Sequence, residues 1–474
     1  MKIQKVLAGI TILVALSFTS AQQAQAKNPK YVFYMIGDGM GINQAVGAQI
    51  YNNATGNGPQ SLNFLEFPVR TFVTTHCATT LVTDSSAAGT ALACGVKTYR
   101  GATGVDKDTV AVSNICEWAK AAGFGVGIAT CVGVNHATPS CFYAHTYSRG
   151  NYEEMVRQLT TAKVDFTAGG GFINQKSKTG HDSKYLEQMM TDAGVSILRG
   201  EQLKDAASHK ERIVCLSSNT EANDLPYYID HTEKDTQLTD FVKAGIDYLT
   251  ANFGRKGFFF MIEGGNIDHA GHNDDGVADF QDVNDFAKAI DEVLEFYKKH
   301  PKETLIIVTA DHETGGLMLG AGEYRMDPER LKVQKCSEVE LNRRFKEFAK
   351  VVEGQEIPSW EKAKEFFSEN LGLWSEISVD EKTEAALKDA YEKSFRKNEG
   401  NDVVTLYSVS TRVVSNAIDY VNKKAGYTWS FSCHSGSPVG LYVKGAGEKE
   451  FISCHDNTDI PLKTAEVAGY KLFE

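Results

Sequence analysis

The sequence predicts an α/β fold: a largely parallel central sheet flanked by helices on both faces. The first observation is a series of short runs that are apolar throughout, which is typical of strands buried on both faces. The second is that helix-like segments separate these runs, as connections between parallel strands require. The apolar runs occupy residues 31–36, 124–131, 212–216, 257–262 and 304–309.

The expected helices alternate with these strands in chain order. In sheets of this kind, functional groups gather beyond the carboxyl ends of the strands. Asp38, Glu263 and Asp311 each stand just past an apolar run. We therefore expect a site at that edge of the sheet. The helical segments are expected near residues 113–121, 236–252 and 277–300.

The character of the chain changes near Gly320. Residues 323–424 are rich in Lys and Glu and have helical periodicity, so we predict a helical insertion there. For most of its residues, the alternative is a charged, solvated surface without a special role. The predicted catalytic domain is then formed by residues 27–322 and 425–474. Helices within the insertion are expected at 338–352, 359–370 and 380–397.

The first 26 residues have the features of a signal peptide. Lys2 and Lys5 precede an apolar stretch at 6–18 that is short for a membrane span, and Ala24-Gln25-Ala26 fits a cleavage site. We expect export and cleavage after Ala26, giving a periplasmic or extracellular protein. The alternative is an uncleaved N-terminal anchor. No later run is long and apolar enough to predict a transmembrane segment.

The charge of the chain limits its partners. Its formal net charge is −12 at pH 7, which argues against a nucleic-acid-binding surface. An anionic substrate would have to be attracted by a local positive site, such as metal ions or an arginine.

The length of the mature chain suits one large α/β domain with insertions, or two domains.

The nine cysteines leave the redox state open. Export permits disulfides, but an odd number leaves at least one thiol unpaired. No CxxC motif occurs, so a cysteine-based zinc site is not expected. Cys433 and Cys454 lie close to the C-terminal histidine candidates and are the first candidates for a bridge.

Acidic and imidazole side chains recur in patterns that suit metal ions. Asp268 and His272 are four residues apart, so on a helical turn they would share one face. Asp311 and His312 follow a strand directly, and His434 lies in a loop of small residues. Each pair alone also has an ordinary structural explanation, such as a turn aspartate, but their recurrence at strand ends favours a metal site.

Counting ligands predicts three ions. Zinc accepts nitrogen and carboxylate oxygen, and a catalytic site keeps one position open. Magnesium prefers an all-oxygen site. Two metals about 4 Å apart can hold the attacking and leaving oxygens of a displacement at phosphorus. The predicted sets are Asp268, His272 and His434 for one zinc ion, Asp38, Asp311 and His312 for a second, and Asp38, Thr138 and Glu263 for magnesium.

A serine near residue 85 completes the pattern. Ser85 and Ser86 follow Asp84 and precede a run of small residues that is expected to begin a helix. The start of a helix offers free N–H groups and the positive end of its dipole, where an alkoxide or phosphoryl group is stabilised. Alone, such a serine is more often only a helix cap.

At this point the chain resembles the metal-dependent alkaline phosphatases. The resemblance runs from Tyr31 to about Gly320 and resumes from about Trp429 to the C-terminus. The order and spacing of the matching motifs are highly specific. These motifs are Gly37–Gly39, Val82–Ala87, Gly95–Tyr99, Asn135–Pro139, Ala144–His145, Glu263–Asp268, Thr309–Gly316 and the loop around His434.

The resemblance implies a role for each matching residue. Ser85 would be the nucleophile that forms a phosphoserine intermediate, because in the family the nucleophile directly follows the aspartate. Arg149 would grip two phosphate oxygens, and Asp84 would orient it. The two zinc ions would stabilise the attacking and leaving oxygens, with magnesium in support. Phosphate monoesters would be the substrates, inorganic phosphate the product, and a homodimer the expected assembly.

Two positions differ from the best-known enterobacterial members, and a third offers an alternative zinc ligand. His136 and His269 stand where those members have aspartate and lysine, as in the animal enzymes and some other bacterial ones. His136 would then lie near the magnesium site and His269 near bound phosphate. His455 is the other late candidate for the third zinc ligand, but His434 fits the family's loop before its final strand better.

Two other functions compete with a phosphomonoesterase. A phosphodiesterase or sulfatase of the same superfamily would usually carry threonine, or a cysteine in a Cys-x-Pro-x-Arg frame, where this chain has Ser85. A non-catalytic metal- or phosphate-binding relative would not need the full set of nucleophile, arginine and ligands. The sequence favours the phosphomonoesterase.

Overall fold

The strands predicted from the apolar runs form the centre of one sheet. The computed structural model describes residues 28–174, 176–320, 324–350, 357–396 and 401–472. The proposed signal peptide therefore lies outside the described residues. The strands of the sheet are β1 (Tyr31–Gly37), β2 (Val69–Val73), β3 (Gly125–Thr130), β4 (Phe166–Gly169), β5 (Ser196–Arg199), β6 (Ile213–Leu216), β7 (Phe258–Gly264), β8 (Thr304–Thr309) and β15 (Val439–Gly445).

The sheet is parallel except at one side. Its order is β2-β15-β8-β1-β7-β3-β4-β6-β5. Strands β8 to β5 in that order pair in parallel, and β15 runs antiparallel to both β8 and β2. Every residue of β1, β7 and β8 is buried, as expected for apolar strands covered on both faces. The predicted fold class is confirmed.

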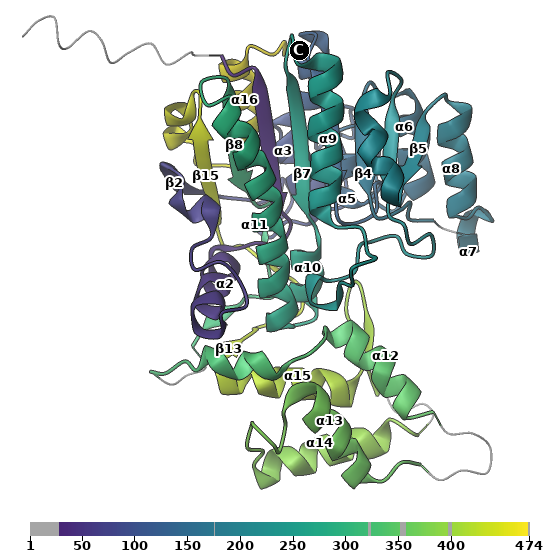
Figure 1. The fold of residues 1–474 in the computed structure, drawn as a ribbon, viewed down its shortest axis with the longest axis vertical. Helices are drawn as coiled ribbons and strands as arrows, with labels where there is room; N and C mark the ends of the chain where they lie inside the picture. The colour runs from purple at the N-terminus through teal and green to yellow at the C-terminus, as the bar shows by residue number, and fades with distance from the viewer. Residues whose placement is uncertain (1–27, 175, 321–323, 351–356, 397–400, 473–474) are drawn as a thin grey trace, which may run out of the picture.

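Helices cover both faces of this sheet (Figure 1). On one face lie α9 (Leu238–Phe253) and α11 (Gly276–Lys299), which contact the central strands. On the other face α3 (Ser85–Cys94), α4 (Ile115–Ala121) and α16 (Asp459–Ala468) contact one another. The helices predicted at 113–121, 236–252 and 277–300 correspond to α4, α9 and α11. The remaining helices near the sheet include α2 (Ile42–Thr55), α5 (Ala137–Ser140), α6 (Tyr152–Thr161), α8 (Ser183–Asp192) and α10 (Asn266–His272).

The charged region after Gly320 forms helices at one end of the sheet. In Figure 1 they lie beside the end at which α10 follows β7. Between the last two of these helices in the sequence, β11 (Asp402–Val404) and β12 (Val409–Thr411) pair as an antiparallel hairpin. Two of the predicted helices end at residues that lie outside the described part of the chain, namely 351–352 and 397. The predicted domain boundaries stay predictions. The helices are α12 (Glu338–Phe348), α13 (Trp360–Leu371), α14 (Glu381–Lys393) and α15 (Arg412–Ala425).

The predicted Cys433–Cys454 bridge is wrong. All nine cysteines are free thiols, Cys433 exposed and Cys454 buried. Strand β15 lies between them in sequence, and its seven extended residues, at about 3.3 Å each, carry the chain away from the loop of Cys433. Closeness in sequence is thus no guide to pairing here. Among the described helices, none combines the length and apolar character needed to cross a membrane.

Candidate active site

Three neighbouring strands bring the predicted carboxylates together. Strands β8, β1 and β7 are adjacent in the sheet, and Asp311, Asp38 and Glu263 stand at their carboxyl ends. All three side chains are fully buried. Next to Asp38, Gly39 has φ of 76°, and a Cβ there would lie 2.6 Å from the Cα of Asp268. Glycine at this position therefore lets α10 approach the end of β1.

The first predicted zinc set is assembled from a helix and a loop. Asp268 and His272 share one face of α10, with His272 Nε2 3.4 Å from Asp268 Oδ1. His434 comes from β14 (His434–Ser435), which pairs with β9 (Glu313–Thr314). Its Nε2 lies 3.0 Å from that of His272 and 3.5 Å from Asp268 Oδ1.

The tautomers of these two histidines favour a bound cation. His272 Nδ1 lies 2.8 Å from the carbonyl oxygen of Ser432, and His434 Nδ1 lies 3.0 Å from that of Thr83. A ring nitrogen that faces a carbonyl must carry the proton, which leaves Nε2 with its lone pair. Two such lone pairs facing each other at 3.0 Å repel unless one ring is protonated or both nitrogens bind a cation. This arrangement fits a metal ion.

The second predicted zinc set lies beside the first. His312 Nε2 is 3.4 Å from Asp38 Oδ1 and 3.2 Å from Asp311 Oδ2. Asp311 Oδ1 accepts hydrogen bonds from the backbone N–H of Gly39 and of His312. Only Oδ2 is thus left for an ion. The hydroxyl of Thr314 donates to Asp268 Oδ1 and lies 3.2 Å from His312 Nδ1, which links the two sets.

The third set includes a histidine as well as oxygens. Atoms of Asp38, His136 and Glu263 lie within 4.8 Å of one another, as do those of each zinc set. Thr138, on α5, donates a hydrogen bond of 3.2 Å to Asp38 Oδ2. The predicted group of Asp38, Thr138 and Glu263 is therefore assembled, and His136 Nδ1 adds a nitrogen to a set that was expected to be all oxygen.

Buried polar atoms without partners indicate that the three sets suit cations. Among the described residues, Asp38 Oδ1, both oxygens of Glu263, Asp268 Oδ2, Asp311 Oδ2 and His136 Nδ1 are buried without a hydrogen-bond partner. Native structures rarely leave such atoms unpaired. A divalent cation in each set would satisfy them.

The pKa values of the carboxyl groups give the same indication. Burial, with repulsion from Asp311 and Asp268, raises the pKa of Asp38 well above its usual value. Burial likewise raises the pKa of Glu263 to about 8 and that of Asp311 to about 7. For Asp268 burial acts in the same direction, but the facing His272 and His434 outweigh it and hold its pKa well below the usual range. The cluster carries more negative charge than its own side chains neutralise.

Ser85 faces the metal sets and Ser86 does not. Ser85 is the first residue of α3, and the Asp84 carboxylate caps the helix by accepting from the N–H of Ala87. Ser85 Oγ lies 3.2 Å from His312 Nε2. Ser86 Oγ instead lies 3.0 Å from the hydroxyl of Thr103. Of the two serines, Ser85 is therefore the one whose hydroxyl lies beside the metal sets.

Arg149 reaches the site from the segment before α6. Its Nη1 is 3.3 Å from Asp84 Oδ2, and its backbone N–H donates to Gly101 O at 2.6 Å. The Asp84 carboxylate in turn accepts from the N–H of Gly101 at 3.0 and 3.1 Å. Asp84 therefore contacts both the helix start and the arginine.

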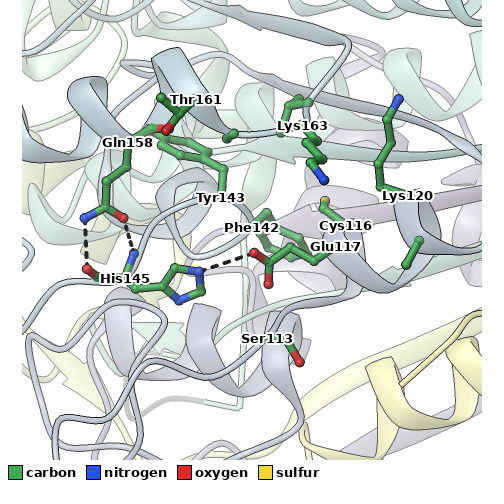
Figure 2. A pocket seen from close by; sticks show the side chains of 13 residues that line it. Ser113, Cys116, Glu117, Lys120, Phe142, Tyr143, His145, Gln158, Thr161 and Lys163 are labelled. Atoms are coloured by element: carbon green, nitrogen blue, oxygen red, sulfur yellow. Dashed lines mark hydrogen bonds and ion pairs between the residues drawn. The ribbon is translucent and has the colours of Figure 1, made fainter. Parts of the chain in front are cut away.

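A cavity of about 660 Å³ lies beside the segment that leads to Arg149 (Figure 2). In it, Gln158 bonds both the N–H and the carbonyl of His145, and His145 Nε2 is 3.7 Å from Glu117. His145 Nδ1 also lies 2.7 Å from Gly104 O. These contacts fix the chain four residues before Arg149.

The site opens into a cleft of about 970 Å³. It is lined by Arg149, His136, His269, His272 and His434, and by residues of the β11–β12 hairpin. In this cleft the ring centroid of His269 lies 5.6 Å from that of His136.

Several residues that line the cleft carry no functional signal in the sequence, Tyr407 among them, whereas the alternative ligand His455 does not line it. Tyr407 of the β11–β12 hairpin lines the cleft, and nothing in its local sequence signals this. His455 is in contact with β2 instead, since its carbonyl accepts from the N–H of Thr74. His455 therefore does not join the three sets.

Comparisons with known proteins agree with this geometry. Residues 29–470 match a family model described as alkaline phosphatase. Alkaline phosphatase 4 of Bacillus subtilis is 30% identical over 96% of this chain and 94% of its own length. A solved cold-active alkaline phosphatase from the psychrophile Shewanella sp. has a TM-score of 0.75 and 27% identity, over 92% of this chain and 99% of its own. A histidine-to-aspartate variant of the alkaline phosphatase from the Antarctic bacterium TAB5, solved with magnesium bound, has a TM-score of 0.63 and 26% identity, over 94% and 99%.

Proposed function

The chain belongs to the alkaline phosphatase family and is a phosphomonoesterase; on that premise we propose that it acts through a phosphoserine intermediate on Ser85, beside two zinc ions and one magnesium ion. The observation that carries this proposal is the meeting of three ligand sets with a nucleophile and an arginine. Ser85 Oγ is 3.2 Å from His312 Nε2, and Arg149 lines the cleft together with the zinc-set residues His272 and His434.

The residues that would hold the metals follow from the three sets. Asp268, His272 and His434 would hold one zinc ion, Asp38, Asp311 and His312 the other. When bound, such ions stabilise the charge that develops on the attacking and leaving oxygens. Magnesium would be held by Asp38, Thr138 and Glu263, with His136 beside it.

The side chains of the chain itself perform the substrate chemistry. The guanidinium of Arg149 has a planar fork that suits two oxygens of a phosphoryl group. Ser85 Oγ attacks phosphorus, the bond to the ester oxygen breaks, and the leaving alcohol takes up a proton. Water then attacks the phosphoserine, which releases inorganic phosphate and restores the Ser85 hydroxyl. The N-terminus of α3 faces the phosphoryl oxygens with its positive dipole end.

Hydrolysis of diesters or sulfates is the alternative activity. Arg149 favours the dianionic monoester, because a diester replaces one charged oxygen by an ester group. The test compares kcat/KM for p-nitrophenyl phosphate, its bis-ester and its sulfate. The proposal predicts the highest value for the monoester, and a higher value for either of the others would contradict it.

Metal analysis tests the cofactor assignment. We expect two zinc ions and one magnesium ion per chain in the purified protein, loss of p-nitrophenyl phosphate hydrolysis after chelation, and its return when zinc and magnesium are added. Activity that persists in the chelated, metal-free protein would contradict the proposal. A non-catalytic relative would show no hydrolysis with any metal loading.

Export, assembly and domain organisation are further parts of the proposal. The signal-like residues 1–26 support a periplasmic or extracellular location, and N-terminal sequencing of the secreted protein should begin at Lys27. A homodimer is expected from the family resemblance and is tested by light scattering. Residues 323–424 are proposed as an insertion into the catalytic domain of 27–322 and 425–474.

A further inference from the structure

The β11–β12 hairpin extends from the helical insertion to the cleft that holds the metal sets. Its residues 404–407 line the cleft together with Arg149. These residues lie more than ninety positions after His312 in the sequence. A segment far from the metal-binding motifs in sequence thus forms part of the wall of the site.

Hydrogen bonds fix this hairpin at both ends. At its turn, Asn273 Oδ1 accepts from Thr405 Oγ1 at 2.9 Å and from Ser408 Oγ at 2.7 Å. Asn273 directly follows His272, so the turn is attached to the end of α10. At its base, Asn342 of α12 accepts from the N–H of Thr411 at 2.9 Å. The position of the turn relative to the site is therefore defined.

Tyr407 at this turn touches three residues of the site. Its ring lies over His269, with centroids 3.7 Å apart and planes inclined by 32°. Its hydroxyl lies 3.5 Å from Arg149 Nη2 and 3.4 Å from His136 Nε2. Both contacts are at the long limit of a hydrogen bond. A phenol has one proton to donate, and neither neighbour holds it at a short distance.

We propose that Tyr407 contacts the substrate: its hydroxyl donates a hydrogen bond to an oxygen of the phosphoryl group that Arg149 holds. This inference rests on the proposed function, since it takes Arg149 as the phosphate-binding residue. The ring of Tyr407, fixed on His269, directs the hydroxyl to the side of the cleft where the arginine fork lies. The insertion thereby contributes a phosphate-binding residue in addition to its charged, solvent-exposed side chains.

Removing only the hydroxyl separates this role from a packing role. Tyr407→Phe keeps the ring on His269 and removes the donor. Tyr420→Phe is the matched control: it makes the same chemical change in the same insertion, where the Tyr420 hydroxyl donates to Ser378 O at 2.9 Å, away from the cleft. Binding of inorganic phosphate to the metal-loaded proteins is measured by calorimetry, with zinc and magnesium content determined for each.

The expected result is weaker phosphate binding in Tyr407→Phe alone. Loss of a hydrogen bond to the charged phosphate should raise the Kd about tenfold or more, with a similar fall in kcat/KM for p-nitrophenyl phosphate and unchanged metal content. Tyr420→Phe should keep the wild-type Kd. A Kd for Tyr407→Phe raised by less than about threefold overturns the proposal.

A second variant covers the case in which Tyr407→Phe loses metal or stability. The double variant Thr405→Val, Ser408→Ala removes the hydrogen bonds that attach the turn to Asn273. It retains the Tyr407 side chain. It should weaken phosphate binding in the same direction, and an unchanged Kd overturns the proposal. If the wild type binds phosphate and hydrolyses monoesters but neither variant differs from it, only the role of Tyr407 fails. If the wild type does neither, the proposed function itself fails.

Discussion

Ser85 Oγ lies 3.2 Å from His312 Nε2, although 227 positions separate the two residues in the chain. Ser85 begins a helix on one face of the sheet, and His312 follows the strand β8. Their meeting places the serine at the edge of the metal sets. The reaction that we propose depends on this contact region.

Replacement of Ser85 by alanine should remove activity. We expect kcat for p-nitrophenyl phosphate to fall at least about a thousandfold, as for other catalytic nucleophiles. Ser86→Ala is the control, because Ser86 Oγ is directed to Thr103 and away from the cluster. A Ser85→Ala enzyme with wild-type turnover, or a Ser86→Ala enzyme that alone is inactive, would refute the assignment.

Replacement of Arg149 by alanine should weaken substrate and product binding. A hydrogen bond to a charged group contributes about 1.5–3 kcal/mol, so the inhibition constant for inorganic phosphate should rise about ten- to a hundredfold. Arg157→Ala is a suitable control, since Arg157 pairs with Glu153 and Glu154 on the surface of α6. Equal inhibition constants for the Arg149 and Arg157 variants would speak against a phosphate-binding arginine.

Removal of the metals should destabilise the protein most at alkaline pH. The pKa of Glu263 is raised to about 8 and that of Asp311 to about 7, so the metal-free folded state holds protons that the unfolded chain has released. Its stability therefore falls as pH rises toward 8. The pKa of His312 is lowered by burial, which has the opposite effect, but only below the unfolded histidine value of about 6.5.

The pH range from 6.5 to 8 is thus the informative one. Between these values the melting temperature of the chelated protein should fall more steeply than that of the zinc- and magnesium-loaded protein. Saturating metal at a thousand times its Kd adds about 4 kcal/mol of stability. A constant difference between the two melting temperatures across this range would show that the carboxyl groups of the metal sets do not take up protons when the metals are removed.

The substitution His136→Asp should tighten magnesium binding. It replaces an imidazole near Asp38 and Glu263 by a carboxylate, and magnesium prefers oxygen ligands. The apparent Kd for magnesium is measured by titrating the activity and the melting temperature of zinc-loaded protein. The same magnesium dependence in wild type and variant would show that His136 does not influence this ion.

The centre of the fold follows from the sequence because its signals are local. Strands β1, β7 and β8 are apolar throughout, and each was expected within two residues of its observed bounds. Strands β2, β4 and β5 have only four or five residues with polar residues among them, unlike the equally short but apolar β6, so they give no clear pattern. Their existence depends on neighbouring strands that bury them, which the local sequence does not reveal.

The metal-site candidates could be named for a related reason. Ligands such as Asp268 and His272 are close in sequence or stand at strand ends, and the parallel sheet brings those ends together. Tyr407 has no such signal, because its approach depends on how the insertion packs against α10. The Cys433–Cys454 pairing failed for a similar reason, because the direction in which β15 carries the chain between the two cysteines has no local sequence signal.

The most direct test of the metal cluster is a crystal structure of the protein grown with zinc and magnesium, with anomalous diffraction recorded at the zinc edge. The account predicts two anomalous peaks, one among Asp268, His272 and His434 and one among Asp38, Asp311 and His312. Absence of peaks from both sets in crystals of an enzyme that hydrolyses phosphate monoesters would contradict it.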